Sequence, residues 1–160
     1  MKNEMELWFT ARGENESLAR MAVASFLATG NPTIEEIADV KTAVSEAVTN
    51  GIIHGYHNGD DREQADEEKK IRLFCRMEGP DFTVIIEDEG CGIEDIPKAM
   101  EPMYTSRPDL ERSGMGFSFM QTFMDELEVK STPGKGTVIQ MKKRIAGNLC
   151  TSEEAVWSRK

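Results

Sequence analysis

The first patterned stretch of the chain alternates apolar and polar positions with a period of two. Its apolar members are Met5, Leu7 and Phe9. This period predicts a half-buried β-strand. From about Glu14 to Ala28 the apolar spacing becomes helical, and Gly30-Asn31-Pro32 then predicts a break. The apolar side expected for this first helix consists of Leu18, Ala22 and Phe26.

A second helix is predicted from Thr33 onward. Glu36 follows Thr33 at the spacing of a capping box, in which each side chain accepts a hydrogen bond from the other residue's backbone. Its apolar stripe, with steps of three or four residues, consists of Ile37, Val40, Val44, Val48 and Ile52. Glu46, Asn50 and His54 are spaced four apart and share the face nearly opposite to that stripe. One side of this helix should therefore pack, while the other offers a carboxylate, an amide and an imidazole.

Two β-hairpins are predicted in the rest of the chain. The first turns at Gly79-Pro80-Asp81 and the second through Pro133-Gly134-Lys135-Gly136. A helix from about Gly116 to Asp125 precedes the second hairpin. Helices on one face of a mixed, mostly antiparallel sheet make an α+β fold, a two-layer α/β sandwich. We expect one domain over residues 1–145 and a poorly patterned, disordered tail over 146–160.

Two segments lack periodicity. The acidic stretch 57–70 is typical of an exposed loop. The segment 88–116 is rich in Gly, Pro and acidic residues, and its length favours a functional lid.

Composition limits the classes of function. The net charge of -10 argues against direct nucleic-acid binding, because contacts to phosphate need Lys and Arg. It is compatible with a basic protein partner, although net charge bears first on solubility. The absence of a long apolar run or a signal peptide leads us to expect a cytoplasmic protein with no membrane contact. The three cysteines lack CxxC spacing, so neither a disulfide framework nor a zinc site is indicated.

Asp88 and the glycines after it form a second candidate site. Asp88 ends the first hairpin on the face that carries Val84 and Ile86. A carboxylate that faces inward needs a partner, and the amino group of an adenine would be one. Gly90 and Gly92 let the backbone turn sharply and approach a ligand closely. Taken alone, the segment is equally typical of an ordinary acidic turn.

A third candidate is the pair Gly114 and Gly116, which stands directly before a predicted helix. Glycines there leave the first-turn N–H groups free to bind phosphate. Neither a P-loop nor the motif set of eukaryotic-type kinases occurs in the chain. A nucleotide, if bound, must be held in another way. A lone GxG is weak evidence, and a polar helix face is by itself usually only solvated.

The order of these motifs resembles the GHKL superfamily, which includes gyrase-type ATPases and bacterial histidine kinases. The motifs are Glu46-Ala47-Val48-Thr49-Asn50, Asp88-Glu89-Gly90-Cys91-Gly92, Gly114-Met115-Gly116 and Gly136-Thr137. Within the superfamily, the segments 1–5, 45–56 and 108–117 look like those of the anti-sigma-F family of sporulation serine protein kinases. Gly51 departs from the Ala usual in that subgroup, and the loop 57–70 is longer.

The resemblance implies that the chain binds ATP or ADP with Mg²⁺. Glu46 would be the general base that takes the proton of a substrate serine, and Asn50, beside His54, would bind the Mg²⁺ that bridges the phosphates. Asp88 would hydrogen-bond the adenine, with Thr137 nearby through water. The glycines that would shape the pocket beside the base are Gly90 and Gly92.

Further implied roles concern the phosphates and the protein partners. The residues that would cradle phosphate are Gly114, Met115 and Gly116, and the segment from Thr105 to Ser113 would close over them. Arg20 resembles a family residue that contacts both protein partners. Arg112 would stabilise the γ-phosphate or contact a partner.

The implied function is to bind and inhibit sigma factor F and to phosphorylate a serine of a STAS-type anti-anti-sigma factor, with the kinase as a homodimer. One alternative is a non-catalytic module that sequesters a sigma factor and holds ATP as a structural ligand. Another is a detached catalytic domain of a histidine kinase. His54 and His57 are the two histidines of the chain, and no helical hairpin bears a phosphoacceptor histidine, which disfavours a self-contained sensor kinase.

Overall fold

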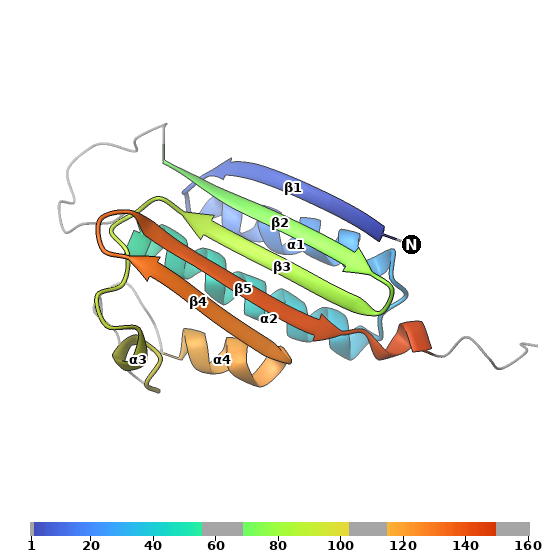
Figure 1. Ribbon diagram of the computed structural model, residues 1–160. Helices are drawn as coiled ribbons and strands as arrows, with labels where there is room; N and C mark the ends of the chain where they lie inside the picture. Colours follow the sequence, from blue (N-terminus) through green and yellow to red (C-terminus); the bar gives the residue numbers. More distant parts are fainter. Residues whose placement is uncertain (1, 56–68, 103–114, 150–160) are drawn as a thin grey trace, which may run out of the picture.

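The computed structural model describes residues 2–55, 69–102 and 115–149 (Figure 1). In chain order the elements are β1 (Lys2–Thr10), α1 (Glu14–Ala28), α2 (Ile34–Asn50), a π-helical turn η1 (Gly51–Gly55), β2 (Lys70–Glu78), β3 (Asp81–Asp88), α3 (Ile96–Ala99), α4 (Gly116–Phe123), β4 (Glu126–Thr132), β5 (Gly136–Arg144) and a 3-10 turn η2 (Ala146–Leu149). Within these ranges no helix combines the length and apolar character needed to cross a membrane.

The five strands form one sheet in the order β1-β2-β3-β5-β4. Each neighbouring pair is antiparallel, so the described sheet has no parallel pair and is not mixed. The long helices α1 and α2 lie on one side of this sheet, with α4 beside α2 (Figure 1). The predicted α+β two-layer sandwich is confirmed, as are both hairpins.

The core lies between the sheet and the helices. Alternate residues of β2 and β3 point into it, and Val40, Val44 and Val48 of α2 meet them with no exposed surface. The predicted bounds of α1 are confirmed, but its predicted apolar side is wrong at Leu18, which is 56% exposed. The buried side is centred one residue further along, on Ala19, Val23 and Leu27. A shift of one residue turns a helix by about 100°, which carries Leu18 out to solvent.

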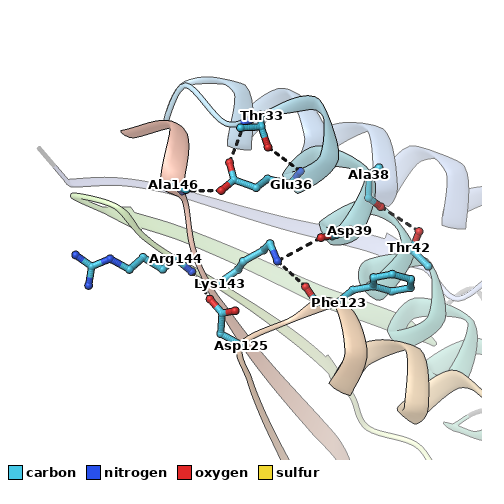
Figure 2. Close-up of polar contacts among 10 residues, drawn as sticks. All are labelled: Thr33, Glu36, Ala38, Asp39, Thr42, Phe123, Asp125, Lys143, Arg144 and Ala146. Carbon is cyan, nitrogen blue, oxygen red and sulfur yellow. Dashed lines mark hydrogen bonds and ion pairs between the residues drawn. The ribbon is translucent and has the colours of Figure 1, made fainter. Parts of the chain in front are cut away.

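The predicted capping box at the start of α2 is confirmed, and it also holds the end of the described chain. Glu36 Oε2 accepts the backbone N–H of Thr33 at 2.8 Å, and Glu36 Oε1 accepts that of Ala146 at 2.6 Å (Figure 2). Burial by itself would raise the pKa of the Glu36 carboxyl, but hydrogen bonds from the backbone groups of Thr33, Ala146 and Gly147 outweigh it and lower that pKa. The first turn of α2 thereby anchors η2.

We expect Glu36→Ala to lower the free energy of unfolding by about 2 kcal/mol at pH 7, because the backbone donors of Thr33, Ala146 and Gly147 lose a charged acceptor. The pKa is lowered on folding, so this stabilisation is present above the ordinary value of 4.5 and is lost as pH falls through the folded value. Urea unfolding checks the loss. The matched control is Glu35→Ala at an exposed neighbouring position, where a change above about 0.5 kcal/mol is not expected. Equal losses in the two variants would contradict the assignment.

Candidate functional site

The polar face of α2 is covered at one point by the first residue of α4. Gly116 is buried, and a methyl group added to it would lie 3.2 Å from Glu46 Oε2 and 3.4 Å from Asn50 Nδ2. Glu46 and Asn50 are themselves half-buried. This face of α2 is therefore not simply solvated; it brings a carboxylate and an amide against the N-terminus of another helix.

The end of α2 also reaches the sheet at Asp88. Gly51 directly follows Asn50, and a methyl group on it would lie 3.7 Å from Asp88 Oδ2 and 3.2 Å from Ile71 Cδ1. These distances place the end of the helix beside Asp88, the last residue of β3. The departure from Ala noted in the sequence therefore falls where the end of α2 lies near Asp88.

Asp88 belongs to a polar row that runs across three strands. It is paired with Thr137 of β5, and Thr137 is paired with Ser131 of β4. Asp88 and Thr137 are 8% and 7% exposed, and the Ser131 and Thr137 hydroxyl oxygens lie 2.8 Å apart. On β2 the same row continues with the apolar Ile71. One end of the core is thus lined with an acid and two hydroxyls.

Ser131 was missed by the sequence analysis. It continues the period-two series of Leu127 and Val129 and so lies on the face that carries Thr137, which is the signal that could have found it. Its hydroxyl accepts the N–H of Ile93 at 2.7 Å and donates to the Gly136 carbonyl at 3.0 Å. It therefore ties the second hairpin to the loop that follows Asp88.

That loop is pressed against the second hairpin along its length. Gly90 N donates to Asp88 Oδ1 at 3.0 Å, and Gly134 N donates to the Cys91 carbonyl at 2.7 Å. Gly92 has φ +74°, and a methyl group there would lie 2.5 Å from the Thr132 carbonyl oxygen. Gly136 has φ +113° and faces the Asp88 carbonyl oxygen too closely for any side chain. These positions need glycine for both conformation and space.

The comparisons with known proteins bear on what this site is. Residues 9–143 match the model of the histidine kinase-like ATPase domain. The chain belongs to that family. The resemblance to the GHKL superfamily is thereby confirmed.

Two relatives with curated descriptions illustrate the similarity within the family. The protein named anti-sigma F factor in Clostridium novyi is 57% identical over 143 residues, which are 89% of this chain and 95% of that protein. The protein of the same name in Oceanobacillus iheyensis is 50% identical over 146 residues, or 91% and 95% of the two chains.

Solved structures share the fold at much lower identity. The crystal structure of the RsbU and RsbW domains of a Mycobacterium tuberculosis protein superposes with a TM-score of 0.56 at 16% identity, over 88% of this chain and 32% of that one. The histidine kinase domain of a blue-light activated histidine kinase from Erythrobacter litoralis gives 0.50 at 20% identity, over 89% and 65%. These two likenesses concern the fold alone.

Within this family fold, Asp88 is a carboxylate held largely away from water. Burial raises the pKa of its carboxyl to about 6, although hydrogen bonds from the backbone groups of Gly90 and Thr137 act in the opposite direction. A buried acid with a raised pKa is typical of a functional site. A hydrogen-bond donor brought by a ligand would favour its ionised form.

The donor set on α2 fits Mg²⁺ held mainly by a bound phosphate chain. Among the described residues, no group of three or more His, Cys, Asp or Glu side chains gathers as a metal site. Mg²⁺ characteristically takes one or two protein oxygens and completes its shell with phosphate and water. The Asn50 carbonyl beside Gly116 is such an oxygen.

The structure describes only some of the other expected site residues. Met115 is the N-cap residue of α4, beside Gly116. Arg20 lies on α1, where it hydrogen-bonds Ser17 at 3.0 Å and lies 3.8 Å from Glu16. His54 lies in η1, but its side chain is outside the description, and the following residues lie outside the described ranges: Thr105, Arg112, Ser113 and Gly114.

The raised pKa of Asp88 predicts a pH-dependent stability in the protein without nucleotide. A group whose pKa rises on folding, here from 3.8 to about 6, stabilises fully below the unfolded value and loses that contribution as pH rises through the folded value. The unfolding free energy of wild type relative to Asp88→Asn should therefore fall between pH 4 and 7, by at most about 3 kcal/mol. Urea unfolding of both proteins across this range measures it. A constant difference would mean that Asp88 does not titrate there.

Proposed function

We propose that this chain is an anti-sigma factor and a serine protein kinase that uses Mg-ATP. In this proposal it binds and inhibits sporulation sigma factor F in the cytoplasm and phosphorylates a serine of a STAS-type anti-anti-sigma factor. The observation that carries the kinase part is the convergence of Glu46 and Asn50 on Gly116 at the start of α4. The anti-sigma part is supported by the relatives named anti-sigma F factor, at 50–57% identity over most of the chain.

The adenine end of the proposed site is Asp88. Its buried carboxylate can accept a hydrogen bond from the amino group of adenine. Thr137 beside it can bind the adenine through a water molecule. Gly90 and Gly92 shape the wall next to the base. A buried acceptor that is left without its donor is costly, so this arrangement should favour adenine over bases that lack an amino group at that position.

The phosphate end of the proposed site lies where α4 begins. The N–H groups at the N-terminus of a helix attract phosphate. We assign this role to Met115 and Gly116, at the start of α4. Asn50 would hold the Mg²⁺, whose contribution when bound is to neutralise phosphate charge. The roles of His54, Thr105, Arg112, Ser113 and Gly114 at this end stay predictions from the family resemblance.

Glu46 is assigned as the general base. Its carboxylate would accept the proton of the substrate serine hydroxyl while the serine oxygen forms a bond to the γ-phosphorus and the bond from that phosphorus to the β,γ-bridging oxygen breaks. The products are phosphoserine and ADP. Phosphoryl transfer asks the protein chiefly for positioning and charge neutralisation, with the base as a further contribution.

Two features support sites for protein partners. The side chain of Arg20 is 37% exposed on α1, and its Nε has no hydrogen-bond partner among the described residues. We therefore keep Arg20 as a contact for the sigma and anti-anti-sigma partners. β1 is an edge strand of the described sheet, and strand edges are common routes of association. We assign it to the homodimer interface.

We expect Glu46→Gln to lower the rate of phosphotransfer to an anti-anti-sigma protein by about 10²-fold or more, while ATP affinity changes by less than about twofold. The phosphotransfer assay uses labelled ATP, and calorimetry gives the affinity. Glu35→Gln on the exposed first turn of α2 is the matched control and should behave as wild type. Full activity of the Glu46 variant would refute the base assignment.

The same assay separates the alternatives. Wild-type protein that binds ATP and transfers no phosphate would be a sequestering module, and phosphohistidine in place of phosphoserine would indicate a histidine kinase.

We expect wild-type protein at micromolar concentration to have the mass of a dimer in light scattering. Pairing at the edge of β1 requires the backbone N–H groups that point away from β2. A proline at a β1 position whose N–H points in that direction should therefore weaken the dimer. A monomeric wild type would remove the homodimer from the proposal.

A further inference from the structure

Lys143 carries a largely buried ammonium group that joins three elements. It projects from β5 on the helix-facing side of the sheet and is 12% exposed. Its Nζ donates to the Phe123 carbonyl oxygen of α4 at 2.7 Å and lies 3.4 Å from Asp39 Oδ2 of α2 (Figure 2). None of these three residues is assigned to the proposed nucleotide site.

Asp39 nevertheless lies on the same face of α2 as the proposed catalytic groups. It precedes Glu46 by seven residues and Asn50 by eleven. At about 100° per residue, these two side chains point roughly 20° to either side of the Asp39 direction. Gly116, the first residue of α4, meets Glu46 and Asn50, whereas Phe123, its last residue, meets Lys143 beside Asp39. α4 is therefore fixed at both ends along one face of α2.

The contacts at its two ends hold α4 in position. A helix of eight residues is too short to be stable by itself, so tertiary contacts must set its place. The Phe123 carbonyl is among the last carbonyls of the helix, which have no partner inside it, and a cation there is also favoured by the helix dipole. Lys143 meets both needs, and its own charge is balanced by Asp39.

We infer that Lys143 is a positioning residue for the phosphate end of the nucleotide site and acts through α4. This inference rests on the proposed function. The adenine end has separate support, because Asp88, Thr137 and Ser131 are held by strands and by the loop after β3. Loss of Lys143 should therefore loosen the contacts to phosphate and leave the contacts to adenine unchanged.

The test compares ADP with adenosine, which lacks the phosphates. Lys143→Met keeps the length of the side chain and removes its charge and donors. We expect it to weaken ADP binding by about tenfold to a hundredfold, as a misplacement on the order of 1 Å would, and to change adenosine binding by less than about twofold. Calorimetry measures ADP directly, and adenosine is measured by equilibrium dialysis.

Three further variants sharpen the result. Lys143→Arg can still reach both acceptors and should restore most of the ADP affinity. Lys142→Met is the matched control: Lys142 is adjacent on β5, points to the open face and pairs there with Glu126 at an exposed position. Asp88→Asn changes the adenine end of the site, so it should weaken the binding of ADP and the binding of adenosine to the same extent.

Equal weakening of ADP and adenosine by Lys143→Met would overturn the inference, since a general loss of structure affects both ligands. Unchanged ADP affinity would overturn it as well. If Lys143→Met does not fold, as judged by circular dichroism, Lys143→Arg and Asp39→Asn take its place. We then expect Asp39→Asn to weaken ADP binding and to leave adenosine binding unchanged. If wild type binds neither ligand, the proposed function itself has failed, and this outcome differs from every result in which wild type binds and only the variants disagree.

Discussion

The site depends on the approach of α4 to the polar face of α2. Gly116 has no side chain, and even a methyl group there would crowd Glu46 and Asn50. The contact brings the N-terminus of α4 against the carboxylate and the amide of α2. In the proposed function, this single approach sets the phosphate chain of the nucleotide beside Glu46, the proposed general base. The rest of the fold can be understood as the means of holding the two helices and the sheet in this relation.

α2 can serve both the core and the site because its two faces are chemically different. Val40, Val44 and Val48 lose all their exposed surface against the sheet, and burial of such side chains is worth roughly 1.5–3 kcal/mol each. That apolar contact fixes the rotation of the helix about its axis. Glu46 and Asn50 are then turned toward α4. At the end of the helix, Gly51 lies near Asp88, so one helix links both ends of the proposed site.

Much of this could be predicted from the sequence because it follows from local pattern. The bounds of α1, the capping box of Thr33 and Glu36, and both hairpins are set by residues close in the chain. What the pattern could not predict depends on tertiary contact. Leu18 faces solvent because Ala19 and Val23, with smaller side chains, face the core instead. The change from α- to π-helix after Asn50 occurs where the helix meets the sheet. Ser131 and Lys143 act on partners that are far away in sequence, at Ile93 and at Asp39.

The supports of the two ends of the site are distinct, and this has a physical consequence. The proposed adenine end is built from paired strands and a loop tied to them by Ser131, around the buried carboxylate of Asp88. The phosphate end is built on a short helix whose place is set by contacts at its two ends. In the proposed function, adenine recognition and phosphate binding can therefore change separately. A displacement of α4 would alter the geometry around Glu46 and Asn50 while Asp88, Thr137 and Ser131 stay paired across the sheet, so the chain could retain a nucleotide by its base when its phosphate contacts are altered.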